Sequence, residues 1–418
     1  AEGFAMACGA LMAGIAGLLW RHHAMRPAWG LRWLAAAMAL AALTTGKRGV
    51  NTIIMDNGVF MFGGHRFRSP ENERGGAMDM RRAIVESSNV YFYSLANELG
   101  VDTIHDQMEP LGFGRLTGID LLGEVKGILP STDWKKRAYK RPEQRRWYAG
   151  ETISLGIGQG YNTFTMLQVA SAMATLVSDG QRFQPRVVRE VEDVVTRERR
   201  VISSQALSRV PYNPEHTAFI REAMFGVTRE GTGTRVFAGS DYLSGGKTGT
   251  AQAVTMRQNE KYNASKMDEY RRDHSLYEAF APLDNPRVAL AVIVENAGFG
   301  SQAAAPIARR VLDYLISGIY PSEEDIVAVG EGRGIAPTGE SRRVSDVPVP
   351  RGMDAFRSDV TKGSEGPAAP ASAASAASGS VAASTSTSTS TSSSASASAS
   401  AVLPAASAVP VPIFGGRR

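Results

Sequence analysis

The chain has 418 residues, of which 43% are hydrophobic and 21% charged, with a formal net charge of +5 at pH 7. This composition is globular, and the charge is too mild to indicate a nucleic-acid partner. The single cysteine, Cys8, excludes internal disulfides, and the six histidines show no spacing typical of zinc sites, so we expect no metal and no cofactor.

The N-terminal segment, residues 1–37, is atypical. Residues 4–20 are apolar and uncharged, at the short end of what a membrane-spanning helix requires. Arg21, Arg26 and Arg32 follow this run, an order of charges that favours a cytoplasmic downstream chain. Two interpretations stay open: an anchor, or the product of a fragment or shifted reading frame. The DNA upstream of residue 1 would separate them.

Residues 38–320 are expected to form one α+β domain. Apolar spacing and capping signals predict helices at residues 81–86, 90–99, 165–178, 216–229 and 303–316, with Gly100 as a helix stop. Residues 241–254 are predicted to form a strand. Residues 288–294 are its expected partner strand, across the turn of residues 282–286.

Residues 321–418 are predicted to be a disordered tail. The chain is Pro-rich after Val344, and residues 366–416 contain no charged side chain and alternate Ser with Thr or Ala. Such a composition buries too little apolar surface to offset the entropy of ordering. A wall-associated or glycosylated linker is the functional alternative.

Residues 135–146 contain seven basic side chains and one acid, Glu143. The simplest expectation is a solvated loop. The alternative is a contact with anionic lipid headgroups or with a polymerase partner.

Two short motifs carry the chemistry. Lys247-Thr248-Gly249 lies in the Gly-rich run from Ser244 to Gln252, and Ser87-Ser88-Asn89 precedes it. These are two of the three motifs of penicillin-interacting acyl transferases. Each also has a simpler structural explanation: Ser and Asn before a helix are N-caps, and the Lys-Thr-Gly run could be a Gly-weakened edge strand with a surface lysine.

Longer runs extend this pattern, and the chain resembles the elongation-type class B penicillin-binding proteins, the penicillin-binding protein 2 branch. The similarity is carried by the runs Gly63-Gly-His-Arg-Phe-Arg68, Leu111-Gly-Phe-Gly-Arg-Leu-Thr-Gly-Ile-Asp120, Gly156-Ile-Gly-Gln-Gly-Tyr-Asn162, Ala279-Phe-Ala-Pro282 and Val294-Glu-Asn296. The resemblance implies the fold shared by penicillin-binding transpeptidases and serine β-lactamases, an antiparallel sheet flanked by helices with a helical subdomain.

The resemblance implies a D,D-transpeptidase that crosslinks peptidoglycan stem peptides through a serine acyl-enzyme and binds β-lactams. Ser87, Asn89 and Lys247 would be the catalytic residues, with Ser87 relaying a proton and Asn89 binding the peptide. Thr248, Gly249 and Thr250 would bind the substrate, and the Thr250 N–H would form half of an oxyanion hole. A membrane glycosyltransferase of the elongation machinery is the implied partner. The implied location is the bacterial inner membrane, with the catalytic domain in the periplasm.

The third motif, Ser-x-x-Lys, is missing from its expected place. The family pattern would put its serine near Arg32 and its lysine near Ala35. Thr44-Thr-Gly-Lys47 lacks the serine, and Ser244-Gly-Gly-Lys247 belongs to the predicted strand, which does not aim a serine at a lysine one helical turn on. We therefore expect no acyl-enzyme from the chain as it stands. The family's N-terminal pedestal domain and anchor are not recognised in the sequence either.

Three classes of function remain open. The first is the transpeptidase, represented by a damaged or partial copy. The second is a non-catalytic penicillin-fold protein that binds stem peptide or a glycosyltransferase partner. The third, a β-lactamase-type hydrolase, does not explain the runs that begin at Gly63 and Gly156.

Overall fold

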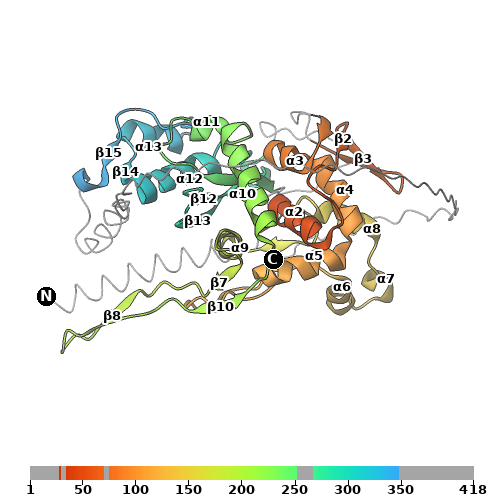
Figure 1. Ribbon diagram of the computed structural model, residues 1–418, viewed down its shortest axis with the longest axis horizontal. Coiled ribbons are helices and arrows are strands. Elements are labelled where there is room, and N and C mark those ends of the chain that lie inside the picture. The colour runs from red at the N-terminus through yellow and green to blue at the C-terminus, as the bar shows by residue number, and fades with distance from the viewer. Residues whose placement is uncertain (1–27, 30–33, 70–74, 252–266, 348–418) are drawn as a thin grey trace, which may run out of the picture. The chain divides into compact units, whose positions relative to one another are not determined.

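The computed structural model describes residues 28–29, 34–69, 75–251 and 267–347 (Figure 1). The apolar run at residues 4–20 and the Ser/Thr-rich part of the tail lie outside these ranges. Among the described helices, none has the length and apolar character needed to cross a bilayer.

The central sheet has three antiparallel strands, β11 (Gly245–Ala251), β12 (His274–Ala281) and β13 (Val288–Val294), in that order. The expected pairing of residues 241–254 with 288–294 is wrong, because β12 lies between these strands. The turn at residues 282–286 joins β12 to β13 as a hairpin. All but the first residue of β12 are buried, which suits a central strand.

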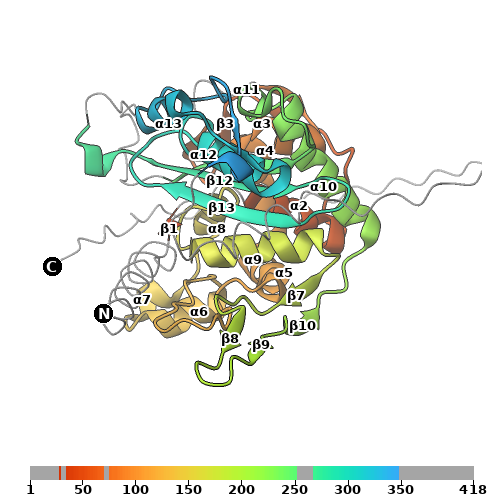
Figure 2. The ribbon, with the colours of Figure 1, turned by 90° about the vertical axis from the view of Figure 1, so that its left-hand side faces the viewer.

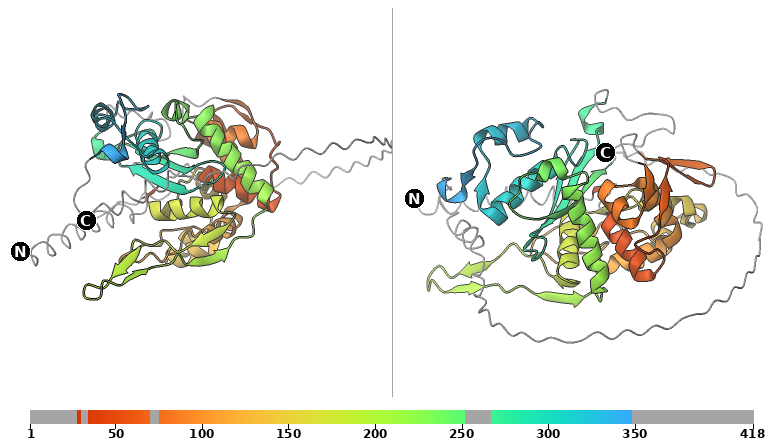
Figure 3. Two further views of the ribbon diagram at one scale, coloured as in Figure 1. Left: turned by 60° about the vertical axis from the view of Figure 1, so that its left-hand side comes forward. Right: turned by 45° about the horizontal axis from the view of Figure 1, so that its top comes forward.

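Helices cover both faces of this sheet. On one face, α9 (Met166–Val177) and α10 (Pro214–Arg229) pack against the side of β12 that carries Leu276 and Phe280. On the other face, α12 (Ala304–Leu312) packs against the side of β12 that carries Tyr277 and Ala279. Figure 2 shows the sheet between α9 and α12. This layering, viewed from two further directions in Figure 3, gives an α+β fold as predicted.

The helical subdomain is built around α2 (Leu34–Thr45), which is buried along most of its length. Around it lie α3 (Met80–Glu86), α4 (Asn89–Leu99) and α5 (Val101–Met108). The helices predicted at residues 81–86, 90–99, 165–178, 216–229 and 303–316 are confirmed, with ends that differ by at most four residues. Gly100 ends α4 as expected.

The remaining elements are short. They are β1 (Ala28–Trp29), β2 (Ile54–Asp56), β3 (Val59–Phe62), β4 (His65–Arg68), β5 (Gly76–Met78), α6 (Thr132–Ala138), α7 (Pro142–Arg145), α8 (Ala149–Leu155), β6 (Thr163–Phe164), β7 (Gln181–Phe183), β8 (Glu190–Glu192), β9 (Arg199–Val201), β10 (Ala206–Arg209), α11 (Thr234–Phe237), β14 (Ile319–Tyr320), α13 (Glu323–Gly330) and β15 (Arg342–Arg343).

The ordered chain continues past residue 320, where we expected a disordered tail to begin. Residues 321–347 include α13 and β15, and β15 pairs with β14. A buried ion pair joins this segment to the rest of the domain: Nη2 of Arg310 in α12 lies 2.6 Å from Oδ1 of Asp325 in α13. Because a buried guanidinium needs a partner, this contact fixes α13 to the domain. At the other end, α2 begins at Leu34 rather than Met38.

The basic run at residues 135–146 is also not a loop, since it forms most of α6 and all of α7. Lys135 is buried, donates hydrogen bonds to Glu151 and lies over the rings of Trp147 and Tyr161. An ammonium among aromatic rings is stabilised by their negative faces. The other basic side chains of the run are exposed.

Candidate active site

Ser87 lies in the turn between α3 and α4, in a left-handed backbone conformation with φ 68° and ψ 36°. This region is uncommon for residues other than glycine, asparagine and aspartate. The next residue holds the turn in place: Ser88 donates from Oγ to Asp56 Oδ2 at 2.5 Å and accepts from the Tyr91 N–H at 3.2 Å. The N-cap that the sequence suggested is therefore Ser88, which leaves the Ser87 hydroxyl available for another partner.

That partner is Lys247 of β11. Its Nζ donates a hydrogen bond to the Ser87 hydroxyl and a second one, of 3.2 Å, to the carbonyl of Thr248. The Lys247 side chain is 0% exposed. The alternative of a surface lysine is therefore wrong, although β11 is an edge strand of the described sheet. The two motifs meet through the contact of Lys247 with Ser87.

Asn89 is the first residue of α4 and is buried. It follows Ser87 by two positions, so the same turn fixes both side chains. The predicted motif Ser87-Ser88-Asn89 thus consists of one serine that contacts Lys247, one serine that caps α4, and one buried asparagine.

Thr248 and Thr250 lie on the same side of β11, because alternate residues of a strand share a face. The Thr248 hydroxyl is 2.7 Å from the hydroxyl of Thr232, and either group can be the donor. Thr232 was not predicted as a site residue, although it lies in the run Gly231-Thr232-Gly233 directly after α10. Gly249 pairs with Leu276 across the sheet.

The glycines of the strand have a packing role that the sequence did not reveal. A Cβ on Gly245 would come 2.3 Å from the Phe280 ring, and a Cβ on Gly246 would come 2.2 Å from the Tyr277 hydroxyl. Both positions therefore exclude side chains so that β12 can approach β11.

Glu278, directly opposite Lys247 on β12, is the second residue that the sequence analysis missed. Its side chain is 2% exposed, and neither carboxylate oxygen has a hydrogen-bond partner. Burial raises the pKa of Glu278 well above the ordinary carboxyl value, while the charge of Lys247 acts in the opposite direction. A lone acid within the apolar strand Ser275–Ala281 was the only available signal.

The position expected for the lysine of the third motif holds Ala35, in the first turn of α2 and 3% exposed. Arg32, near the position expected for the nucleophile, lies outside the described residues. In the sequence, Ser-x-x-Lys spacing occurs only at Ser244–Lys247, and the last three residues of this run form the start of β11. The structure thus brings the Ser87-Ser88-Asn89 turn and the Lys247-Thr248-Gly249 strand together, with an alanine where the lysine of the third motif is expected.

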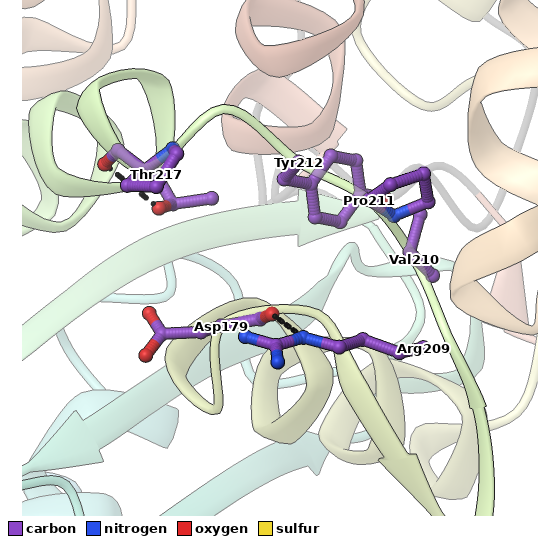
Figure 4. Close-up of a pocket in the computed structure, with 7 residues that line it drawn as sticks. Asp179, Arg209, Val210, Pro211, Tyr212 and Thr217 are labelled. Atoms are coloured by element: carbon purple, nitrogen blue, oxygen red, sulfur yellow. Dashed lines mark hydrogen bonds between the residues drawn. The ribbon is translucent and has the colours of Figure 1, made fainter.

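A cavity of about 280 Å³ lies elsewhere, between the end of α9 and the start of α10, and includes none of the predicted site residues. Some of the polar groups that line it are hydrogen-bonded to one another. Arg209 Nε donates to the carbonyl of Asp179 at 3.1 Å, and the Thr217 hydroxyl donates to the carbonyl of Pro214 at 3.0 Å (Figure 4). Nothing in this cavity suggests catalysis, so the candidate site is the junction of Ser87 and Lys247.

The fold and this junction define a penicillin-binding transpeptidase domain, and the chain belongs to that family: residues 36–313 match the penicillin-binding protein transpeptidase domain. Among individual proteins, it is similar to the peptidoglycan D,D-transpeptidase MrdA of Haemophilus influenzae. The two are 38% identical over 301 residues, which cover 69% of this chain and 44% of that protein. The chain thus spans less than half the length of this relative.

Solved structures agree with this assignment. The crystal structure of Pseudomonas aeruginosa PBP2 in complex with WCK 5153 matches with a TM-score of 0.59 and 31% identity, covering 70% of this chain and 62% of that one. A chain from the structure titled "Structural coordination of polymerization and crosslinking by a peptidoglycan synthase complex" matches with a TM-score of 0.58 and 28% identity, covering 70% and 46%. These similarities confirm the predicted fold class and the penicillin-binding protein 2 branch.

Proposed function

We propose that this chain carries the stem-peptide site of a peptidoglycan D,D-transpeptidase that acts in cell elongation. The observation that carries the proposal is the hydrogen bond from Lys247 to Ser87, which joins two motifs separated by 160 positions. The MrdA relative supports the same substrate class.

In the proposed reaction, the serine hydroxyl of an intact Ser-x-x-Lys motif, which this chain lacks as it stands, attacks the carbonyl carbon of the D-Ala-D-Ala peptide bond, and D-Ala leaves as an amine. The proton that the attacking hydroxyl loses passes through Ser87 to the nitrogen of the leaving D-Ala, and Lys247 supplies the positive potential that orients the Ser87 hydroxyl. Asn89 hydrogen-bonds the peptide. The amine of a neighbouring stem peptide then attacks the ester carbonyl of the acyl-enzyme; an amide bond forms, the ester bond breaks, and the proton lost by the amine returns to the serine oxygen.

The C-terminal carboxylate of the stem peptide binds the hydroxyls of Thr248 and Thr250 in this proposal. The backbone N–H of Thr250 provides half of the oxyanion hole, a contribution usually worth about 3 kcal/mol of the barrier. The contact between Thr248 and Thr232 orients one of these hydroxyls before the ligand arrives.

Covalent labelling by a fluorescent penicillin tests the proposal. The chain as it stands has Ala35 in place of the motif's lysine, so we expect non-covalent binding and no label. The double variant Arg32→Ser/Ala35→Lys restores the motif and is expected to become labelled, whereas adding Ser87→Ala and Lys247→Met to it abolishes the label. A double variant that folds and binds penicillin without labelling would contradict the assigned position of the nucleophile.

A second candidate is a non-catalytic protein of the same fold, and the buried Ala35 is the observation that favours it. This candidate predicts that the wild-type gene itself lacks the Ser-x-x-Lys motif. Resequencing the DNA that encodes residues 1–45 decides between the two: an intact motif in another frame supports the transpeptidase.

We further propose that the protein works at the bacterial inner membrane, with this domain in the periplasm and a membrane glycosyltransferase as partner. The structural similarity to a chain of a peptidoglycan synthase complex supports the partner. Co-purification of the chain with a glycosyltransferase from membranes of the same cells tests both statements. Recovery of the chain from the soluble cytoplasmic fraction alone would contradict them.

A further inference from the structure

The segment that contains α6 and α7 carries a group of exposed positive charges, and the two helices lie side by side (Figure 2). Of its seven basic side chains only Lys135 is buried, and Lys136 forms an ion pair with Asp133 at 2.9 Å. We call the other five the basic surface: Arg137, Lys140, Arg141, Arg145 and Arg146. Within the part of the chain that the structure describes, these five side chains form no ion pair.

This segment holds the excess positive charge of the whole chain. Residues 133–146 contain seven basic and two acidic side chains and thus have a net charge of +5, which equals the formal net charge of all 418 residues. Like charges at neighbouring exposed positions repel one another and do not stabilise the fold. Their concentration in one segment therefore indicates an anionic partner.

The buried Lys135 fixes the segment to the domain. Its Nζ donates hydrogen bonds to Glu151 of α8 and lies 5.3 Å from the centroid of the Trp147 ring. On the other side of α7, Trp147 Nε1 donates to the Thr152 hydroxyl at 2.8 Å. The exposed cations therefore lie on an ordered surface, which loses less conformational entropy on binding than a loop would.

Helix α8 links the basic surface to the candidate active site. Near its start, Glu151 binds Lys135. Directly after its end, Gly156 is so close to α4 that a Cβ there would lie 2.3 Å from the carbonyl oxygen of Phe92, one helical turn beyond Asn89. Helix α8 spans about 10 Å, a distance that about three residues of extended peptide cover. A polymer that occupies the site can thus also reach the basic surface.

We propose that the basic surface is a second contact for peptidoglycan and binds carboxylates of a strand whose reacting stem peptide occupies the active site. The inference rests on the proposed function, because that function supplies a polymer with repeated carboxylates. Four of the five side chains are arginines, and a guanidinium binds a carboxylate through two parallel hydrogen bonds. A second contact on the same polymer raises its affinity, because this contact forms within the complex.

The side chains of the segment do not suit a lipid bilayer. A helix that binds a membrane surface presents an apolar face that enters the interface. In residues 131–148, all of which the structure describes, Tyr148 is the only large hydrophobic side chain that is exposed, at 39%. Trp134 and Trp147 pack against Tyr161 instead. A carboxylate-bearing polymer matches the charges without needing an apolar face.

Co-sedimentation of the full chain with purified insoluble peptidoglycan tests the inference. The triple variant Arg137→Gln/Lys140→Gln/Arg141→Gln should bind about tenfold more weakly than the unmodified chain at about 0.05 M ionic strength. The difference should vanish at about 0.5 M, where exposed charges are screened. The matched control Arg197→Gln/Arg199→Gln/Arg200→Gln removes three exposed charges in and beside β9 and should bind like the unmodified chain.

Two further ligands identify what the surface binds. Peptidoglycan whose carboxyl groups have been converted to amides should bind the unmodified chain and both triple variants equally, and a remaining difference would overturn the role of carboxylates. Vesicles of phosphatidylcholine and phosphatidylglycerol in equal parts represent a membrane. Tighter binding of the unmodified chain to these vesicles than to peptidoglycan, lost in the variant of residues 137, 140 and 141, would assign the surface to lipid and overturn the inference.

The affinity of N-acetyl-D-Ala-D-Ala, measured by ligand-observed NMR, separates this inference from the proposed function. The dipeptide spans about 7 Å, too short to occupy the site and reach the basic surface, so both triple variants should bind it like the unmodified chain. Equal peptidoglycan binding by the two triple variants overturns the inference and leaves the stem-peptide site intact. Absence of dipeptide binding by the unmodified chain overturns the proposed function and the inference that rests on it. Equal urea unfolding of the two triple variants shows that folded proteins are compared.

Discussion

Lys247 on β11 donates a hydrogen bond to the hydroxyl of Ser87, in the turn between α3 and α4. This contact links the sheet to the helical subdomain. Ser87 adopts a left-handed backbone conformation here, and Lys247 is fully buried. A left-handed backbone at a serine and a fully buried lysine both cost stability.

Replacing Lys247 by methionine should separate function from folding. The variant loses the charge that attracts the ligand carboxylate, so we expect at least about a tenfold loss of N-acetyl-D-Ala-D-Ala affinity. Its free energy of unfolding should change little, because the loss of the hydrogen bonds to Ser87 and to the Thr248 carbonyl opposes the gain from replacing a buried ammonium by an apolar side chain. Dipeptide titration and urea unfolding measure the two effects. Lys136→Met, at an exposed position, is the control, and unchanged dipeptide affinity in Lys247→Met would contradict the site.

The backbone strain at Ser87 can be measured by comparing Ser87→Gly with Ser87→Ala. Both variants lose the hydroxyl that Lys247 contacts, so the difference between them isolates the left-handed conformation. Glycine adopts this conformation without a Cβ penalty, and we expect Ser87→Gly to be more stable by about 1 kcal/mol in urea unfolding. Equal stabilities would mean that the turn is not strained at this position.

Glu278 should make the stability of the domain depend on pH. Because its pKa is raised in the folded state, the folded protein holds a proton that the unfolded chain has already released. The contribution of this bound proton to the stability of the fold is fully present below the ordinary carboxyl pKa of 4.5. It is lost as the pH rises through the raised pKa that Glu278 has in the folded protein.

The unfolding free energy should therefore fall across this window, by at most about 1.4 kcal/mol per pH unit. Glu278→Gln should lack this component, whereas Glu198→Gln should retain it. Urea unfolding at a series of pH values measures the slope, and a slope unchanged in Glu278→Gln would show that Glu278 is not protonated in the folded protein.

The pair of Arg310 and Asp325 should be essential for docking residues 321–347. Asp325→Ala leaves a buried guanidinium without its partner, and we expect a loss of about 3 to 5 kcal/mol. Arg310→Met combined with Asp325→Leu should recover much of this loss. Glu331→Ala removes an exposed ion pair with Arg333 and should cost less than about 1 kcal/mol. If Asp325→Ala behaved like Glu331→Ala in urea unfolding, the buried pair would not hold α13 in place.

Local signals in the sequence predicted much of the helical framework. The helices on either side of Ser87 and the stop at Gly100 follow from apolar spacing and capping, which depend on neighbouring residues only. The strand of Lys247 was predicted from its motif, although it begins at Gly245 rather than at residue 241. The family was identified from short ordered runs, and residues 36–313 confirm it.

Local signals in the sequence did not predict contacts between segments that are distant along the chain. The position of β12 between β11 and β13, the contact of Thr232 with Thr248, and the ion pair that orders residues 321–347 each join parts of the chain that no local pattern relates. The sequence by itself determined the helices and which motifs would be present. Only the tertiary structure decided that Lys247 reaches Ser87 and faces Glu278, because strand pairing and burial, and hence charge state, depend on the packing of the whole domain.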